Sequence, residues 1–177
     1  MQLEAEIKKT IRDIPDYPKP GVVFKDISPL LASPRLVDQM LNEQVRYWAG
    51  KNIDAVAAIE ARGFIFGSLL AHALKCPFIP VRKSGKLPYK TMSQDYSLEY
   101  GKASIEMHID SIEKEWNVLV HDDLLATGGT AIAAGNLVQK LGGKVIGFSF
   151  LVNLSFLPGE KNLKEKFSTD IFYLAEY

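Results

Sequence analysis

The chain has 177 residues, of which 47% are hydrophobic and 24% charged, a composition typical of a soluble globular protein with one sizeable core. Its 21 basic and 21 acidic residues cancel, which excludes the charge bias of a protein that binds nucleic acid or anionic membranes. No apolar stretch approaches a membrane span, and the charged N-terminus lacks the apolar core of a signal peptide. The single cysteine, Cys76, excludes an intramolecular disulfide, so we expect the protein in a reducing cytoplasm. From the length we expect one domain, 1–177.

Helical and extended patterns alternate along the chain. Apolar residues at fourfold spacing, such as Leu3, Ile7 and Ile11, indicate helices, and short β-branched runs indicate buried strands. In chain order the predicted elements are a helix at 2–13, a β-like run at 22–24, a helix at 34–49, a strand at 54–59, a helix at 64–75, a strand at 78–81, a strand pair at 97–100 and 103–109, a strand at 118–121, a helix at 131–141, and strands at 145–152 and 171–174. Residues 83–95 are polar, basic and glycine-containing, which predicts a long loop.

Strands that alternate with helices predict right-handed βαβ units, and therefore an α/β fold with a mostly parallel sheet. In such sheets ligands bind beyond the carboxyl ends of the strands. Two candidate segments fall at such ends, namely Asp122-Asp123 and the run Glu60-Ala61-Arg62-Gly63.

The stretch from Val118 to Ala131, VLVHDDLLATGGTA, joins a strand end to paired acids and a loop of small residues. Glycines let a backbone approach a ligand closely, and loop amides at a helix N-terminus can hold a phosphate. Asp122 and Asp123 cannot bind phosphate directly, but they fit hydroxyl groups or a metal on the same ligand. A sugar phosphate has both kinds of group. The alternative is a solvated turn in which Thr130 caps the next helix.

This motif resembles the phosphoribosyl pyrophosphate motif of the type I phosphoribosyltransferases. Four other segments resemble the adenine-specific members of that family, and they occur in the family order. They are PDYPKPGVVFKDISPL at 15–30, AIEARGFIFG at 58–67, VRKSGKLP at 81–88 and YSLEYGK at 96–102. The resemblance implies a twisted sheet flanked by helices, a small N-terminal hood at about 1–34, a flexible lid loop at about 83–95, and a homodimer.

The resemblance implies that the 5-phosphoribosyl group moves from phosphoribosyl pyrophosphate to adenine, which gives AMP and pyrophosphate. The residues expected to hold the 5′-phosphate form one loop, Ala126, Thr127, Gly128, Gly129 and Thr130. The ribose diol is expected at Asp122 and Asp123, and Mg²⁺ is expected to arrive with the substrate near these acids. The cations expected to face pyrophosphate are Arg62, Arg82, Lys83 and Lys86, although the two lysines are equally compatible with solvated surface charges.

Glu99 is the first candidate catalytic residue, because in the resembling family this glutamate contacts the purine and assists proton movement as the ring nitrogen attacks. Tyr100 is expected to position it, and Arg62 is the second catalytic candidate. The loop that contains Arg62 has a non-proline cis peptide in that family.

The adenine is expected to meet the backbone of the segment containing Val23, Phe24 and Lys25, with Phe24 stacked on the base or packed in the core. Lys25 departs from the pattern of animal members, where arginine is usual.

Two alternatives stay open. The first is a related transferase that acts on xanthine, hypoxanthine, guanine or orotate, which should lack the segments VVFKDISP and YSLEYG. The second is a non-catalytic regulator that senses phosphoribosyl pyrophosphate, which usually has an added nucleic-acid-binding module or a basic face.

Overall fold

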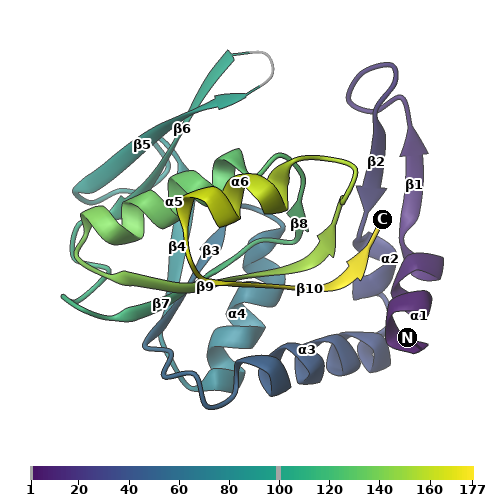
Figure 1. Ribbon diagram of the computed structural model, residues 1–177, viewed down its shortest axis with the longest axis horizontal. Helices are drawn as coiled ribbons and strands as arrows, with labels where there is room; N and C mark the ends of the chain where they lie inside the picture. Colours follow the sequence, from purple (N-terminus) through teal and green to yellow (C-terminus); the bar gives the residue numbers. More distant parts are fainter. Residues whose placement is uncertain (1, 99–100) are drawn as a thin grey trace.

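The computed structural model describes residues 2–98 and 101–177, and it shows a central sheet flanked by helices on both faces (Figure 1). The helices are α1 (Gln2–Thr10), α2 (Ser28–Leu31), α3 (Pro34–Trp48), α4 (Gly63–Leu74), α5 (Gly129–Lys140) and α6 (Gly159–Lys166). The strands are β1 (Arg12–Pro15), β2 (Val23–Asp26), β3 (Ala55–Ile59), β4 (Phe78–Lys83), β5 (Thr91–Leu98), β6 (Gly101–His108), β7 (Asn117–His121), β8 (Leu124–Leu125), β9 (Lys144–Asn153) and β10 (Asp170–Glu176).

The central sheet is parallel over most of its width, which confirms the predicted α/β class. Its strand order is β10-β9-β7-β3-β4-β6-β5, and β8 pairs with β9 outside this path. Strands β10, β9, β7, β3 and β4 are parallel, whereas β6 and β5 add an antiparallel hairpin at one edge. All five residues of β3 are buried, because helices cover this central strand on both faces.

The two faces of the sheet carry separate helices (Figure 1). Alternate residues of β3 divide between the two layers: Ala57 lies in the core beneath α5, and Val56 packs with Trp48 and Leu70 of α3 and α4. Cys76 is half-buried beside this second cluster. Within residues 2–98 and 101–177, no helix combines the length and apolarity needed to cross a bilayer.

The N-terminal segment does not continue as a helix to residue 13, as the apolar spacing predicted. Helix α1 ends at Thr10, whose hydroxyl donates to the Glu6 carbonyl at 2.8 Å, and Arg12–Pro15 forms β1. Strand β1 pairs with β2 in a separate two-stranded antiparallel sheet. The pairing with β2 is a non-local interaction, so the spacing of Ile7 and Ile11 could not reveal it. This small sheet lies at one side of the molecule, apart from the central sheet (Figure 1).

The predicted loop at 83–95 is wrong for residues 91–95, because these begin β5. Met92 and Tyr96 are partly buried against the core, whereas Ser93 and Asp95 are exposed. This alternation is typical of a half-buried strand, but polar residues between the apolar ones concealed it. The irregular part is therefore 84–90. The pairing of β5 with β6 confirms a strand pair in this region, but the bounds differ from the predicted 97–100 and 103–109, because β5 begins at Thr91 and Gly101 belongs to β6.

Helix α6 was not predicted from the sequence. Its segment GEKNLKEK is highly charged and buries only Gly159 and Leu163, so it lacks the apolar stripe of an ordinary surface helix.

Helix α5 begins at Gly129 rather than at Ala131, which places Thr130 inside its first turn instead of at the N-cap. Gly128 occupies the N-cap position with a φ of +82°, a conformation that favours glycine.

Candidate active site

The acid pair lies at the carboxyl end of β7, as expected for a ligand site in a parallel sheet. The Asp123 amide donates to Oδ1 of Asp122 at 2.9 Å, and the Asp123 carbonyl accepts from the amides of Leu151 and Val152 at 3.1 and 3.0 Å. The backbone of the turn is thus held by β9. Burial, reinforced by the charge of Asp123, raises the pKa of Asp122 well above its ordinary value. Burial also raises the pKa of Asp123, against the opposing effect of Arg62.

Arg62 connects the acid pair to the N-terminal segment. Its Nε atom lies 2.9 Å from Oδ2 of Asp123, and its Nη1 atom donates to the Lys25 carbonyl at 3.0 Å. Its guanidinium carbon lies 4.7 Å from the centroid of the Phe24 ring. Three segments that are far apart in the sequence therefore meet at one side chain.

The turn that contains Arg62 packs closely on the acid pair. The Glu60–Ala61 peptide bond is cis, as the resemblance implied. A Cβ atom on Gly63 would lie 2.8 Å from Oδ1 of Asp122 and 3.1 Å from its Cα atom. Glycine at this position therefore allows the start of α4 to approach the acids, a requirement that the sequence analysis did not recognise.

The glycine-rich loop borders a small pocket of about 80 Å³, lined by Asp122, Leu124, Leu125, Ala126, Thr127, Gly128, Gly129, Thr130, Ala131 and Phe150. The loop is held from behind by α6. A Cβ atom on Gly159 would lie 2.2 Å from the Ala126 carbonyl oxygen, and Nδ2 of Asn162 donates to the Thr127 carbonyl at 2.9 Å. The close approach of Gly159 and the Asn162 hydrogen bond hold the loop against α6, and the N-terminus of α5, which follows the loop, carries amides that can bind an anion.

Two of the four predicted pyrophosphate cations, Arg82 and Lys86, pair with Glu60. Arg82 donates from Nε to Oε2 of Glu60 at 2.7 Å, and Nζ of Lys86 lies 3.0 Å from Oε1. Burial acts to raise the pKa of Glu60, but hydrogen bonds from Arg82 and Lys86 hold that pKa below its ordinary value. Lys83 is exposed at the end of β4 and is not among the cations paired with Glu60.

Glu106 holds the 84–90 loop and was also missed by the sequence analysis. Its carboxylate is buried on β6, and its Oε1 atom accepts from the amides of Lys86 and Leu87, both at 3.0 Å. Burial acts to raise the pKa of Glu106, but these backbone hydrogen bonds keep it lowered. An acid between Ile105 and Met107, both buried in the same strand, was the signal that could have identified it.

In its two-stranded sheet, β2 pairs with β1 along one edge, and its other edge faces away from β1. The Val22 carbonyl accepts from the Tyr17 amide at 3.2 Å across the hairpin, so the peptide groups of Val23 and Lys25 face the opposite direction. Arg62 reaches the Lys25 carbonyl from that opposite side. Phe24 is half-buried and meets Tyr17 edge-on at 5.2 Å. A cavity of about 810 Å³ borders this edge, and Ala126 and Thr127 line both it and the small pocket.

Glu99 and Tyr100 lie outside the described residues, so their predicted roles stay predictions.

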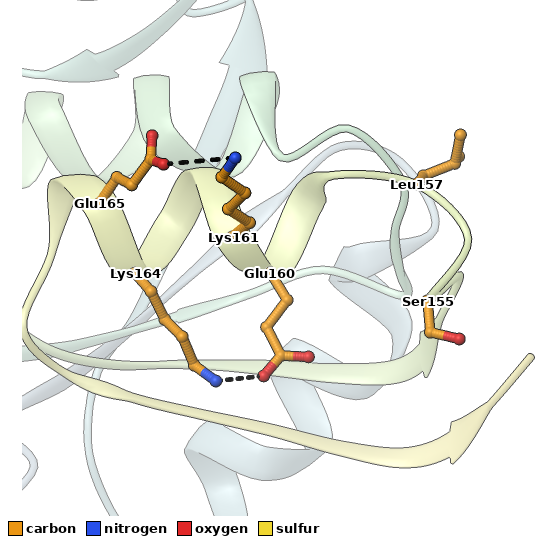
Figure 2. A pocket seen from close by; sticks show the side chains of 6 residues that line it. All are labelled: Ser155, Leu157, Glu160, Lys161, Lys164 and Glu165. Atoms are coloured by element: carbon orange, nitrogen blue, oxygen red, sulfur yellow. Dashed lines mark hydrogen bonds and ion pairs between the residues drawn. The ribbon is translucent and has the colours of Figure 1, made fainter.

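A separate hollow of about 510 Å³ lies along α6, and Figure 2 shows the charged side chains that line it. Lys164 pairs with Glu160 and Lys161 with Glu165 within the helix. These pairs fit a solvated helix surface. The hollow contains none of the predicted site residues.

His121 precedes the acid pair and is fully buried, and neither ring nitrogen has a hydrogen-bond partner within the described part of the chain. Burial lowers the pKa of His121 to about 3 from 6.5. Between pH 6.5 and pH 3 the unfolded chain therefore binds a proton at His121 that the folded chain does not. The free energy of unfolding decreases as the pH falls through this range.

We expect His121→Val to be more stable than the wild type, and the gain to grow by about 2 kcal/mol between pH 7 and pH 5 because this proton uptake is removed. Urea unfolding at both pH values measures it. His72→Val, at an exposed position on α4, is the matched substitution of a surface histidine. An equal gain at pH 5 and pH 7 would contradict the assignment.

Known proteins with similar sequences belong to one family of transferases. A family model described as a phosphoribosyl transferase domain matches residues 25–172. The adenine phosphoribosyltransferase of Methylobacterium radiotolerans is 49% identical over 159 residues, which cover 90% of this chain and 88% of the relative. The chain belongs to the adenine phosphoribosyltransferase family. This membership confirms the resemblance seen in the five sequence segments.

Solved structures of adenine phosphoribosyltransferases share the whole fold. The Thermoanaerobacter pseudethanolicus protein superposes with a TM-score of 0.93 at 46% identity, over 98% of this chain and 99% of that one. The Saccharomyces cerevisiae protein, solved with an imino-altritol bisphosphate and adenine, has a TM-score of 0.89 at 34% identity over 98% of both chains. The predicted type I phosphoribosyltransferase fold is therefore confirmed.

Proposed function

We propose that this protein transfers the 5-phosphoribosyl group from phosphoribosyl pyrophosphate to adenine, giving AMP and pyrophosphate in purine salvage. The observation that carries the proposal is the position of Arg62, which joins the acid pair to the Phe24–Lys25 segment. A ligand that spans these groups needs a sugar phosphate at one end and a flat base at the other. The assigned family acts on such a ligand pair.

The phosphate and sugar roles follow from the donor and acceptor groups. Residues 126–130 line the small pocket, and their amides would fit the 5′-phosphate because they carry fixed partial positive charge. Asp122 and Asp123 then accept hydrogen bonds from the 2′- and 3′-hydroxyls. Their negative charge also favours the cationic character that the ribose gains as the bond to pyrophosphate breaks.

The pyrophosphate role falls to Arg62, Arg82 and Lys86, with Lys83 exposed beside them. Glu60 holds Arg82 and Lys86 in place, which preorganises positive charge near the acid pair. As ribose–pyrophosphate cleavage proceeds, these cations neutralise the developing negative charge on the leaving oxygens. The 84–90 loop that carries Lys86 is the lid in this proposal, and it excludes water from the activated sugar.

Mg²⁺ fits the donor set of this site as a substrate-borne ion. Among the described residues no group of three or more His, Cys, Asp or Glu side chains could enclose a metal, but Asp122 and Asp123 supply hard oxygen ligands. Together with substrate oxygens they would hold the ion, which supplies neutralising charge to pyrophosphate.

Adenine selectivity is proposed for the free edge of β2. The Val23 carbonyl can accept from the N6 amino group, and the Lys25 amide can donate to N1. Hypoxanthine and guanine present O6 and N1–H instead, so both hydrogen bonds would be reversed. The Phe24 ring, beside Arg62, is available to stack on the base.

The direct test mixes the protein with adenine, phosphoribosyl pyrophosphate and Mg²⁺ and measures AMP. We expect AMP to form with adenine, and turnover with hypoxanthine or guanine to be lower by about 10⁴-fold because the Val23 carbonyl and the Lys25 amide would both be left unpaired against the base. Absence of AMP, or equal turnover with hypoxanthine, would contradict the proposal.

Arg62→Gln is expected to raise the KM for phosphoribosyl pyrophosphate by about 10- to 100-fold, since it removes one charged hydrogen-bond donor. Steady-state kinetics measure this value. Arg46→Gln is the control, because Arg46 is exposed on α3 and pairs with Glu43 of the same helix. An unchanged KM in Arg62→Gln would remove Arg62 from the pyrophosphate site.

The proposal also includes a homodimer in the cytoplasm. Ile65 and Leu69 lie one turn apart on α4 and are 38% and 36% exposed, which gives an apolar strip for a second subunit. Light scattering on the purified protein tests the dimer.

A further inference from the structure

The side chain of Lys25 is buried, although its peptide group belongs to the proposed base-reading edge. It is 9% exposed, and its ammonium donates to both carboxylate oxygens of Asp13 at 2.7 and 2.9 Å. Asp13 is its direct partner across the β1–β2 hairpin. The Lys25 ammonium also lies 3.8 Å from the centroid of the Tyr177 ring, a distance that gives a strong cation–π contact.

Tyr177 belongs to the opposite wall of the 810 Å³ cavity. Its amide donates to the Asn153 carbonyl at 2.9 Å, and its own carbonyl accepts from the amide and the hydroxyl of Ser155 at 2.8 and 2.7 Å. These bonds attach Tyr177 to the segment after β9, which contributes Leu154 and Leu157 to the cavity lining. Val23 and Lys25 line the facing wall.

The Lys25–Tyr177 contact therefore joins β2 to the segment that carries Leu154 and Leu157, beside the cavity that borders the proposed base-reading edge. We propose that the Lys25 ammonium, held by the Asp13 carboxylate against the Tyr177 ring, is a positioning group that sets the distance from the β2 reading edge to the Leu157 wall. The proposal rests on the proposed function for the identity of the base. It predicts an effect mainly on adenine binding, because the Lys25 ammonium contacts Asp13 and Tyr177, which are not among the residues assigned to phosphoribosyl pyrophosphate.

Three variants test this role. Tyr177→Leu removes the ring, whereas Tyr177→Phe keeps it. Lys25→Met removes the cation. We expect Tyr177→Leu and Lys25→Met each to raise the KM for adenine by about 3- to 30-fold, with less than about twofold change in kcat and in the KM for phosphoribosyl pyrophosphate. Tyr177→Phe should stay within about twofold of the wild type in all three values.

The double variant Lys25→Met/Tyr177→Leu adds a second measurement. If the two side chains act through one contact, its KM for adenine should equal that of either single variant rather than the product of the two changes. Multiplicative changes would overturn the proposal. So would equal effects of Tyr177→Leu and Tyr177→Phe, or parallel changes in the KM values of both substrates.

Asp13→Asn covers the case in which a cavity-forming variant does not fold. Asp13 is 55% exposed, so this substitution leaves the core intact while it removes the carboxylate charge that holds Lys25. We expect its KM for adenine to rise in the same selective way, and an unchanged value would overturn the proposal. Wild-type protein that makes no AMP would refute the proposed function, whereas normal AMP synthesis with unaffected variants would refute only this inference.

Discussion

The double substitution Asp122→Asn with Asp123→Asn is expected to abolish productive binding of phosphoribosyl pyrophosphate. Each asparagine replaces a carboxylate with a neutral amide that keeps one acceptor oxygen, so the charge-assisted hydrogen bonds to the diol are lost, and the dissociation constant should rise by about 10²- to 10⁴-fold. Asparagine has nearly the same shape as aspartate, so the closely packed Gly63 should not be disturbed. Isothermal titration calorimetry with Mg²⁺ and the substrate measures the affinity.

The double variant should remain folded, which separates lost binding from lost structure. Because burial raises the pKa of Asp122 above its unfolded value, ionisation is less favourable in the folded chain, and its contribution to stability decreases as the pH rises through the folded pKa. An asparagine side chain at this position cannot ionise, so the variant does not lose this stability at neutral pH. Asp110→Asn, at an exposed position, is the control. Undiminished affinity in the double variant would refute the diol assignment.

Glu99→Gln is expected to lower kcat by about 10- to 10³-fold, with much less change in the KM for either substrate. In the proposed reaction the purine nitrogen that attacks the ribose must lose a proton, and a carboxylate can accept it whereas an amide cannot. The assignment depends on the segment YSLEYGK at 96–102, which begins in β5 and ends in β6. Rapid-quench measurement of a single turnover isolates the chemical step from product release.

Glu113→Gln is the matched control, because Glu113 is exposed and lies away from the sheet ends that carry the site. It should turn over normally. A single-turnover rate in Glu99→Gln equal to that of the wild type would remove Glu99 from the mechanism, and the proton would then have to leave through solvent or another group.

The parts of the site that are contiguous in sequence were predictable. Asp122, Asp123 and the loop 126–130 lie on one strand–loop–helix unit, so their order along the chain also fixes their order in space. The buried strand β3 and helix α3, with Ser33 at its N-cap, were also clear from local signals.

The parts that depend on contacts between distant segments were not predictable. No local pattern indicates that Arg62 reaches both Asp123 and Lys25, or that Lys25 points to Tyr177 rather than to the base. Glu60 appeared in the sequence only as a neighbour of Arg62, yet it holds two cations from β4 and its following loop. Such pairings are set by tertiary packing, which single-sequence patterns do not record.

The position of a bound nucleotide tests the central claim most directly. In a crystal structure of the protein with AMP, we expect the 5′-phosphate to accept hydrogen bonds from amides of residues 126–130, and the ribose hydroxyls to lie within about 3 Å of the Asp122 and Asp123 carboxylates. AMP bound with its phosphate elsewhere, and with residues 122–130 turned away from it, would contradict the account.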